Sequence, residues 1–320
     1  MLYALTTGGG GLVDAPFYAN RVGRAKRNTG YKSGIVVAIL GFVMKDTSSP
    51  NRILVPPIGI IAGNGQFPIE CIAEAERRGL PVVIIAHRGE TDPAIAEDGR
   101  VVRWIRVGQL GAIIRFFKKH KVASVICSGG IRRVGIFQGA RPDWRALRVI
   151  ARVGSLRDDE ILRGIAEELA SEGMEVIGAE QLLADSLPSR GCLTRRAIRD
   201  DERKSADVGW RAAAVIGSLD IGQTVCVKDG VVVAVEGVEG TDATIERAGA
   251  LAGPGVIVVK RAKPQQDMRL DLPAVGEQTI AVLKKANAAG LVLEEKRALL
   301  LKPDAIVRSA DAAGLFIEVW

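Results

Sequence analysis

The sequence predicts an α/β protein with a parallel-sheet amino-terminal domain followed by a mixed α+β carboxyl-terminal domain. A length of 320 residues corresponds to roughly two domains. Hydrophobic residues make up 48% of the chain, which is enough for a sizeable core and excludes an intrinsically disordered protein. Apolar runs alternate with helical patterns in the first half, whereas a hairpin signal marks a different second half.

The sheet of the first domain is predicted from short, continuously apolar runs. Such runs are typical of strands buried on both faces, because helices cover both sides of a parallel sheet. The predicted strands are residues 58–62, 81–86, 101–107, 122–127 and 174–178. The predicted helices are residues 68–78, 110–121, 158–171 and 180–185.

The segment 187–191 contains proline and glycine and indicates a boundary, so we expect domains over 58–188 and 192–320. In the second domain, Asp229-Gly230 between two apolar runs is a strong hairpin signal. The predicted strands are residues 223–228, 231–236, 255–260 and 315–319. The predicted helices are residues 197–216, a segment from about 241, and 276–289.

Composition excludes several kinds of site and partner. Four cysteines without a CxxC pair exclude a thiolate zinc site of the usual spacing and a disulfide-dense scaffold. Two histidines exclude a histidine-rich centre, so any metal would be held mostly by oxygen. The net charge of +7 comes largely from residues 1–57, with seven bases and two acids, and a nearly neutral body argues against nucleic-acid binding.

Residues 1–57 form a leader that lies outside the predicted domains. We expect either a translation start placed too early, with Met44 as an alternative start, or a disordered tail. A membrane-surface anchor is the alternative. The apolar run 35–44 follows basic residues as in a signal peptide, but it lies too deep and is too short to span a membrane.

A glycine-containing turn follows the first predicted strand. Gly63 and Gly65 stand just before a helix, where backbone amides can approach a phosphate at the positive helix end. A tight structural turn is the alternative interpretation. NAD is disfavoured, because Pro68 replaces the third glycine of the dinucleotide fingerprint and the second strand ends in His87 instead of an acid.

Two further features of the first domain have both a structural and a functional interpretation. Ser128 and Gly129 follow a strand at its carboxyl end, where open α/β sheets bind ligands, although a plain loop is equally compatible. Asp158 and Asp159 begin a helix, where acids commonly cap the helix but could also hold a metal or a substrate hydroxyl.

Three carboxylates gather where a strand of the second domain leads into a helix. Glu236, Glu239 and Asp242 are separated by glycines, which weaken a strand end and therefore often mark a functional site. Asp242 could cap the helix or bind a ligand. Oxygen donors without histidine suit Mg²⁺, which takes one or two carboxylates together with substrate phosphate.

Charged residues also interleave in a proline-bounded loop over residues 260–273. The lysines and arginines of this loop, which begins at Lys260, could clamp a diphosphate, and Asp267 could add a metal ligand. A solvated charged loop is the alternative.

The motifs of both halves resemble the UDP-2,3-diacylglucosamine pyrophosphatase family of the LpxI type. The resemblance covers about residues 58–320 and leaves the leader outside. Gln265 stands where the family commonly has glycine. The segments that carry the resemblance are IGIIAGNGQFP (58–68), SGGIRR (128–133), DDEILRGIAEELASEGMEVIGAEQLL (158–183), AVEGVEGTDATIERAGAL (234–251), KPQQDMRLDLPAVG (263–276) and the terminal DAAGLFIEVW.

The resemblance implies a Mg²⁺-dependent hydrolase of lipid A synthesis. Such an enzyme cleaves UDP-2,3-diacylglucosamine to UMP and 2,3-diacylglucosamine 1-phosphate. It has a Rossmann-like amino-terminal domain and a distinct carboxyl-terminal domain, and it binds the substrate between them. Its essential acid falls on Asp242, which would hold the metal or orient water, with Glu239 and Asp267 as candidate second ligands. Lys263 would act at the phosphates. The residues expected to bind substrate are Gly63, Gly65, Ser128, Gly129, Thr241 and Arg269.

The same resemblance implies a cytoplasmic protein. Because the substrate carries two acyl chains, peripheral contact with the inner membrane is expected, and a homodimer is compatible with the two-domain organisation. Two competing classes stay open: a non-catalytic carrier or sensor of lipid intermediates, and another nucleotide-sugar enzyme.

Overall fold

The computed structural model describes residues 54–96, 99–131, 140–154 and 157–320. All of them belong to one compact unit, Arg52–Trp320. The expectations for the leader, including Met44, therefore lie outside the described residues apart from 54–57, as do Arg132 and Arg133 of the SGGIRR segment.

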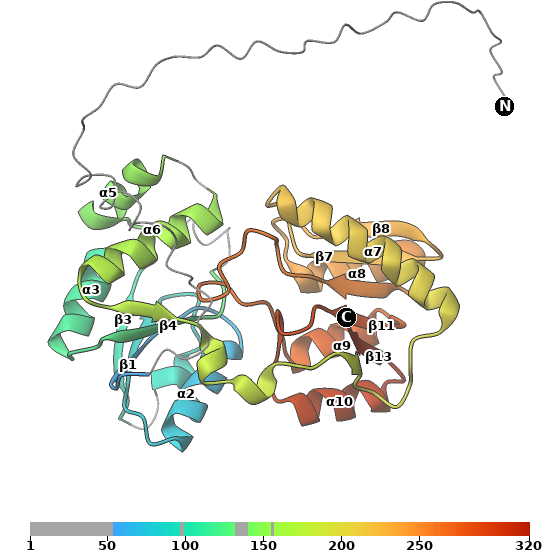
Figure 1. Ribbon diagram of the computed structural model, residues 1–320, viewed down its shortest axis with the longest axis horizontal. Coiled ribbons are helices and arrows are strands. Elements are labelled where there is room, and N and C mark those ends of the chain that lie inside the picture. Colours follow the sequence, from blue (N-terminus) through green and yellow to red (C-terminus); the bar gives the residue numbers. More distant parts are fainter. Residues whose placement is uncertain (1–53, 97–98, 132–139, 155–156) are drawn as a thin grey trace, which may run out of the picture. The chain divides into compact units, whose positions relative to one another are not determined.

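Among the described residues, the amino-terminal half contains a five-stranded, fully parallel sheet with the strand order β3-β2-β1-β4-β5 (Figure 1). This sheet confirms the predicted parallel α/β class. The strands are β1 (Ile58–Ala62), β2 (Val82–His87), β3 (Val101–Ile105), β4 (Ser124–Ser128) and β5 (Glu175–Ile177). The helices are α2 (Phe67–Arg77), α3 (Leu110–Lys119), α5 (Trp144–Val153) and α6 (Asp158–Ser171).

Helices cover both faces of this sheet. Alternate strand residues point to opposite sides, and because both sets are apolar, each face packs against helices. Ile60, Ile84 and Ile126 lie side by side in register and pack in the core that contains α2. Val83 and Val125 point the other way, into the core formed with α3, α5 and α6. The continuously apolar strand sequences are therefore explained by burial on both faces.

The order in which successive strands are added to the sheet reverses between β1 and β4, which are parallel neighbours. From β1 the chain proceeds outward to β2 and β3, and then it crosses back to β4 and continues to β5. In open α/β sheets the crevice at such a reversal, outside the carboxyl ends of the strands, is the usual ligand site. The loops that follow β1 and β4 meet there.

In the described part of the carboxyl-terminal half, a six-stranded mixed sheet has the order β6-β13-β11-β9-β7-β8. Asp229 and Gly230 both adopt positive φ, which confirms the predicted hairpin between β7 and β8. The strands are β6 (Gly191–Cys192), β7 (Thr224–Lys228), β8 (Val231–Val235), β9 (Ile257–Lys260), β11 (Gly290–Leu293) and β13 (Phe316–Val319). The helices are α7 (Asp200–Ser218), α8 (Thr241–Ala252), α9 (Glu277–Lys285) and α10 (Pro303–Ala312).

The helices again divide between the two faces of the sheet. The core on one side contains residues of α7, and the core on the other contains residues of α8, α9 and α10. A two-stranded parallel ribbon, β10 (Ala274–Val275) and β12 (Leu299–Leu300), lies beside them. Leu272, Leu299 and Leu301 pack in the same core as α2, so the two halves share apolar contacts.

Several elements differ from the sequence prediction. The predicted helix 180–185 is two short 3-10 turns, Ala179–Gln181 and Ala184–Ser186. The predicted helix 276–289 ends at Lys285, and β11 follows it. Helices α5 and α10 and strand β11 were not predicted from the sequence. For α5 the missed signals are its caps, Asp143 before the helix and Gly154 after it.

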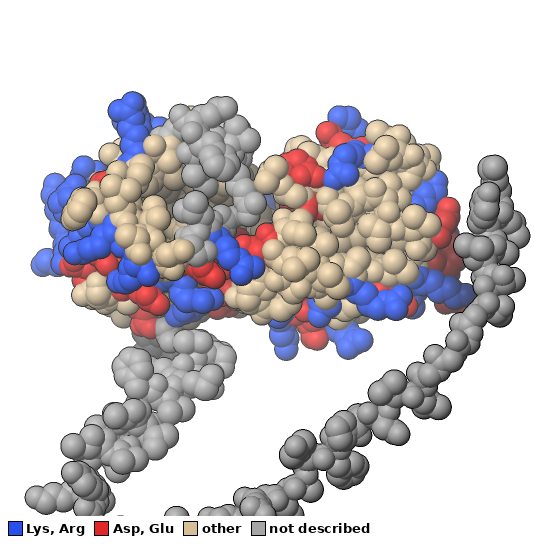
Figure 2. Space-filling view, turned by 90° about the horizontal axis from the view of Figure 1, so that it is seen from above, with Lys and Arg blue, Asp and Glu red and all other residues tan. Residues whose placement is uncertain are grey.

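On the face shown in Figure 2, Lys and Arg side chains are interspersed with Asp and Glu side chains over the described residues. Within that part of the chain, no helix is both long and apolar enough to cross a bilayer.

Candidate active site

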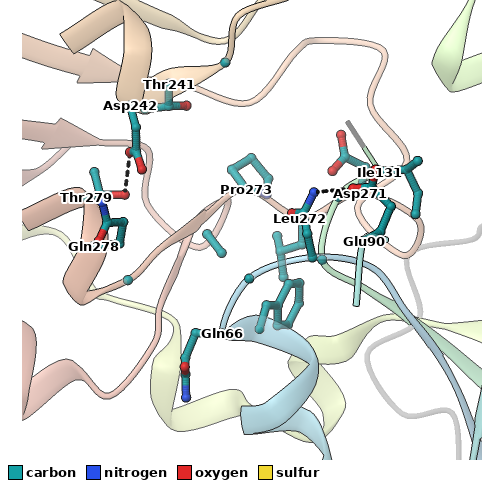
Figure 3. A pocket seen from close by; sticks show the side chains of 18 of the residues that line it. Gln66, Glu90, Ile131, Thr241, Asp242, Asp271, Leu272, Pro273, Gln278 and Thr279 are labelled. Atoms are coloured by element: carbon teal, nitrogen blue, oxygen red, sulfur yellow. Dashed lines mark hydrogen bonds between the residues drawn. The ribbon is translucent and has the colours of Figure 1, made fainter. Parts of the chain in front are cut away.

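A pocket of about 2080 Å³ is lined by residues of both halves of the compact unit. Its volume exceeds the roughly 300–1,000 Å³ of an ordinary small-molecule site, so it has room for a large ligand. One part of the wall comes from the loops after β1, β2 and β4 and the start of α2, and another from the start of α8, the end of β9 and the start of α9 (Figure 3).

The two glycine turns of the amino-terminal half are locked against each other. The Gly63 N–H donates to the Ser128 carbonyl at 2.8 Å, and the Asn64 N–H donates to the Gly130 carbonyl at 2.8 Å. A Cβ at Gly63 would lie closer than 3.0 Å to Gly130, so glycine is required for this close approach. The amides of Gly63 and Asn64 are therefore already hydrogen-bonded, and Gly63 does not line the pocket.

At this turn, the residues that are exposed to the pocket follow directly after Asn64 in the chain. Gly65, with a φ of +81°, and Gln66 are exposed and line the pocket immediately before α2. Gly129 also lines the pocket, whereas Ser128 is buried beneath it. Of the predicted nucleotide-side residues, the structure thus places Gly65 and Gly129 at the pocket and gives Gly63 and Ser128 supporting positions.

The start of α8 brings Thr241 and Asp242 to the opposite wall. The Thr279 hydroxyl, at the start of α9, donates to Asp242 Oδ1 at 3.3 Å and so helps to orient the carboxylate (Figure 3). Gly240 precedes α8 with a φ of +85°, a backbone conformation that favours glycine. The glycine that looked unfavourable at a strand end is needed for the sharp entry into this helix.

Two buried charges surround Thr241: Glu236, which was predicted as part of the carboxylate cluster, and Lys260, which was predicted only as the start of the charged loop. The Thr241 hydroxyl donates to Glu236 Oε1 at 2.9 Å and accepts from Lys260 Nζ at 3.3 Å. Lys260 also donates to the Ala274 carbonyl at 3.1 Å, and both charged residues line the pocket. The structure places Lys260 at the end of the otherwise apolar strand IVVK, β9.

Glu239, a predicted catalytic residue, lines the pocket but is tied to its own loop. Its carboxylate accepts from the Gly237 N–H at 3.1 Å, the Thr244 hydroxyl at 3.2 Å and Arg247 at 2.6 Å. Backbone hydrogen bonding within the loop and the Arg247 contact lower the pKa of Glu239. These partners hold the loop that leads into α8.

Lys263 lies at the pocket within a buried charge cluster. Its Nζ donates to Asp220 Oδ1 at 2.6 Å and to Asp159 Oδ1 at 3.2 Å. Burial alone would lower the pKa of Lys263, but the hydrogen bond and charge of Asp220 together with Asp159 raise it. Asp159 thus pairs with a lysine of the other half, while the side chain of Asp158 lies outside the described parts of the chain.

Asp267 and Arg269, both predicted site residues, bind each other. Arg269 donates from two nitrogens to the two carboxylate oxygens of Asp267, at 3.0 and 2.6 Å. Although burial raises the pKa of Asp267, the contacts with Arg269 outweigh it and lower the pKa. Neither residue is among those that line the pocket, so the structure does not place Asp267 beside Asp242 at its wall.

Asp271 lines the pocket and accepts a hydrogen bond from Gln266 at 2.5 Å. Burial raises its pKa above the ordinary value of 3.8, even though Lys263 acts in the opposite direction. The folded protein therefore binds this proton more tightly than the unfolded chain, and the contribution of Asp271 to stability falls as pH rises from about 3.8 through the folded-state pKa.

We therefore expect Asp271→Asn to raise the free energy of unfolding at pH 8 relative to wild type, and this gain to shrink towards pH 4. Urea unfolding of both proteins at the two pH values measures the effect. Asp304→Asn, at an exposed position of α10, is the control. A wild-type and variant difference that is independent of pH would contradict the prediction.

The predicted Mg²⁺ would need oxygen ligands from the side chains that line the pocket. In the parts of the chain that the structure describes, no group of three or more His, Cys, Asp or Glu side chains is arranged to hold a metal. Mg²⁺ usually binds through one or two carboxylates and completes its shell with substrate phosphate and water. Asp242 lines the pocket, so its carboxylate fits a site in which the protein and the substrate phosphate would bind Mg²⁺ together.

The fold and the pocket define an α/β protein with two sheets and a large pocket lined by the starts of α2 and α8. The LpxI N-terminal domain family matches residues 57–186, and the LpxI C-terminal domain family matches residues 189–318. The chain is also 32% identical over 274 residues to the UDP-2,3-diacylglucosamine pyrophosphatase LpxI of Caulobacter vibrioides, covering 81% of this chain and 96% of that protein. The chain belongs to the LpxI family, which confirms the resemblance found in its motifs.

Proposed function

We propose that this protein hydrolyses UDP-2,3-diacylglucosamine to UMP and 2,3-diacylglucosamine 1-phosphate in lipid A synthesis. The observation that carries the proposal is the position of Asp242. It lies at a helix start on one wall of a large pocket whose other wall is a glycine turn at the switch point of a parallel sheet. The relative from Caulobacter vibrioides carries the name of this activity.

In the proposed reaction, a water oxygen forms a bond to the α-phosphorus. The bond between this phosphorus and the bridging oxygen breaks, and that oxygen leaves with the β-phosphate on the lipid product. Asp242, held by Thr279, orients the water, whose protons pass to solvent. Positive charge from Lys260 and Lys263 at the pocket wall offsets the negative charge on the phosphate oxygens.

Asp242 is the residue that we propose to hold Mg²⁺, together with phosphate oxygens of the substrate. When bound, the ion supplies additional neutralisation of charge on the diphosphate. Glu239 and Asp267 were the other candidate ligands, and both already have basic partners in Arg247 and Arg269. We therefore expect these two residues to contribute less to metal binding than Asp242.

The test is release of UMP from UDP-2,3-diacylglucosamine in the presence of Mg²⁺ or of EDTA. We expect UMP to appear only with the metal, because a carboxylate and a phosphate repel each other and the cation would join Asp242 to the substrate. A folded protein that binds the lipid nucleotide without releasing UMP would instead support a carrier. Release that is unchanged by EDTA would overturn the role of the metal but not the hydrolysis.

A further inference from the structure

The turn that follows β2 is held rigidly beside the pocket. The Thr91 hydroxyl donates to the Ala62 carbonyl at 2.6 Å and accepts from the His87 N–H at 2.9 Å. The ring Nδ1 of His87 lies 2.9 Å from the same Ala62 carbonyl. Both side chains are buried, and burial lowers the pKa of His87, which favours a neutral ring donating from Nδ1. The last residue of β1 thus anchors the turn.

This turn presents Glu90 to the ligand space. The Glu90 and Thr91 N–H groups both donate to the His87 carbonyl, at 3.1 and 2.9 Å, and Gly89 has a φ of +80°. Glu90 is partly exposed and lines the pocket. Asn64, in the turn after β1, donates its side-chain amide to Glu90 Oε2 at 3.2 Å, so a carboxylate and an amide from neighbouring strand ends meet there.

The position of this pair suits a sugar diol. A phosphate at the start of α2 would lie beside Gly65 and Gln66, with the attached nucleoside extending over the carboxyl ends of β1 and β2. In parallel α/β folds an acid after the second strand accepts hydrogen bonds from ribose hydroxyls. Strand β2 itself ends in His87, but Glu90 follows three residues later and lines the pocket.

We infer that Glu90 binds the vicinal hydroxyls of the ribose in the uridine nucleotide, with Asn64 orienting its carboxylate. This inference rests on the proposed function, because it assumes a ribonucleotide in the pocket. A ribose hydroxyl donates to Glu90, and the Asn64 amide retains its own hydrogen bond to the same side chain. Glu90 is accordingly a binding residue that selects ribonucleotides over deoxyribonucleotides.

The test compares binding of UMP, 2′-deoxy-UMP and 3′-deoxy-UMP to the full chain by calorimetry. We expect wild type to bind UMP roughly tenfold or more tightly than at least one deoxy analogue, since a hydrogen bond to a carboxylate is lost. In Glu90→Ala this preference disappears, because UMP binding weakens to the level of the deoxy analogue. The control Glu76→Ala, at an exposed residue of α2 that pairs with Arg100, keeps the wild-type preference.

Several outcomes would overturn the inference. One is equal affinity of the wild type for all three nucleotides, and another is an unchanged preference in Glu90→Ala. If Glu90→Ala does not fold, Glu90→Gln replaces it, with a reduced preference expected and an unchanged preference contradicting the inference. UMP release from UDP-2,3-diacylglucosamine is measured separately, so failure of the proposed hydrolysis is distinguished from failure of the ribose contact.

Discussion

Asp242→Asn is expected to lower the rate of UMP release by at least about 10³-fold, comparable to removing a group that acts mainly on the transition state. The amide keeps the size of the side chain and its contact with Thr279, but it loses the charge that binds Mg²⁺ and orients water. Stability should change by only about 1 kcal/mol or less, which is the usual effect of a charge at a helix start. Initial rates and urea unfolding measure both effects.

Asp304→Asn is the matched control, because Asp304 also lies in the first turn of a helix but does not line the pocket. We expect this variant to retain wild-type activity. Substrate binding by Asp242→Asn, measured in the absence of metal, should be close to that of wild type. Full activity in Asp242→Asn would refute the assignment of this carboxylate.

Gly129→Ala should destabilise the protein by about 2–4 kcal/mol, combining left-handed backbone strain with overpacking. Gly129 has a φ of +75°, and a Cβ there would lie closer than 3.0 Å to the Asn64 carbonyl oxygen. Relief of this contact requires the turns after β1 and β4 to separate. We expect the hydrogen bonds from Gly63 and Asn64 to be weakened, and UMP release to fall as the turns lose their alignment.

The neighbouring Gly130→Ala is the control for this experiment. Its Cβ would come no closer than 3.6 Å to Asn64 Oδ1, and its φ is not positive. We expect a change of about 0.5 kcal/mol or less in the free energy of unfolding, as for an unstrained surface substitution. Equal unfolding midpoints for the two variants would show that the turns are not interlocked as described.

Much of the fold follows from local pattern. Strands buried on both faces read as apolar runs, so β1, β2 and β4 were predicted to within two residues of their observed ends. The helix α6 was predicted with the same bounds that the structure shows. Shorter or more polar elements were missed, because α5 carries several arginines and the short strand β11 begins only a few residues after α9.

The candidate site was predictable only in part. Asp242 and Gly65 stand at glycine-marked turns between a strand and a helix, and the structure places both at the pocket. Lys260 was predicted only as part of the charged loop 260–273, and Glu90, which lies in a charged turn, was not predicted as a site residue. Each is recognisable as a site residue only when the loops of distant strands are seen together.

Local sequence determined where strands and helices form, where glycine is needed and which residue types are available for phosphate chemistry, because these depend on near-neighbour sterics and side-chain chemistry. The tertiary structure decided which of those groups face the pocket and which are already paired with other protein groups. Lys263 meets Asp159 from 104 residues away, and the Gly63 amide is occupied by Ser128. Such pairings depend on strand order and close packing, which bring together groups that no local pattern relates.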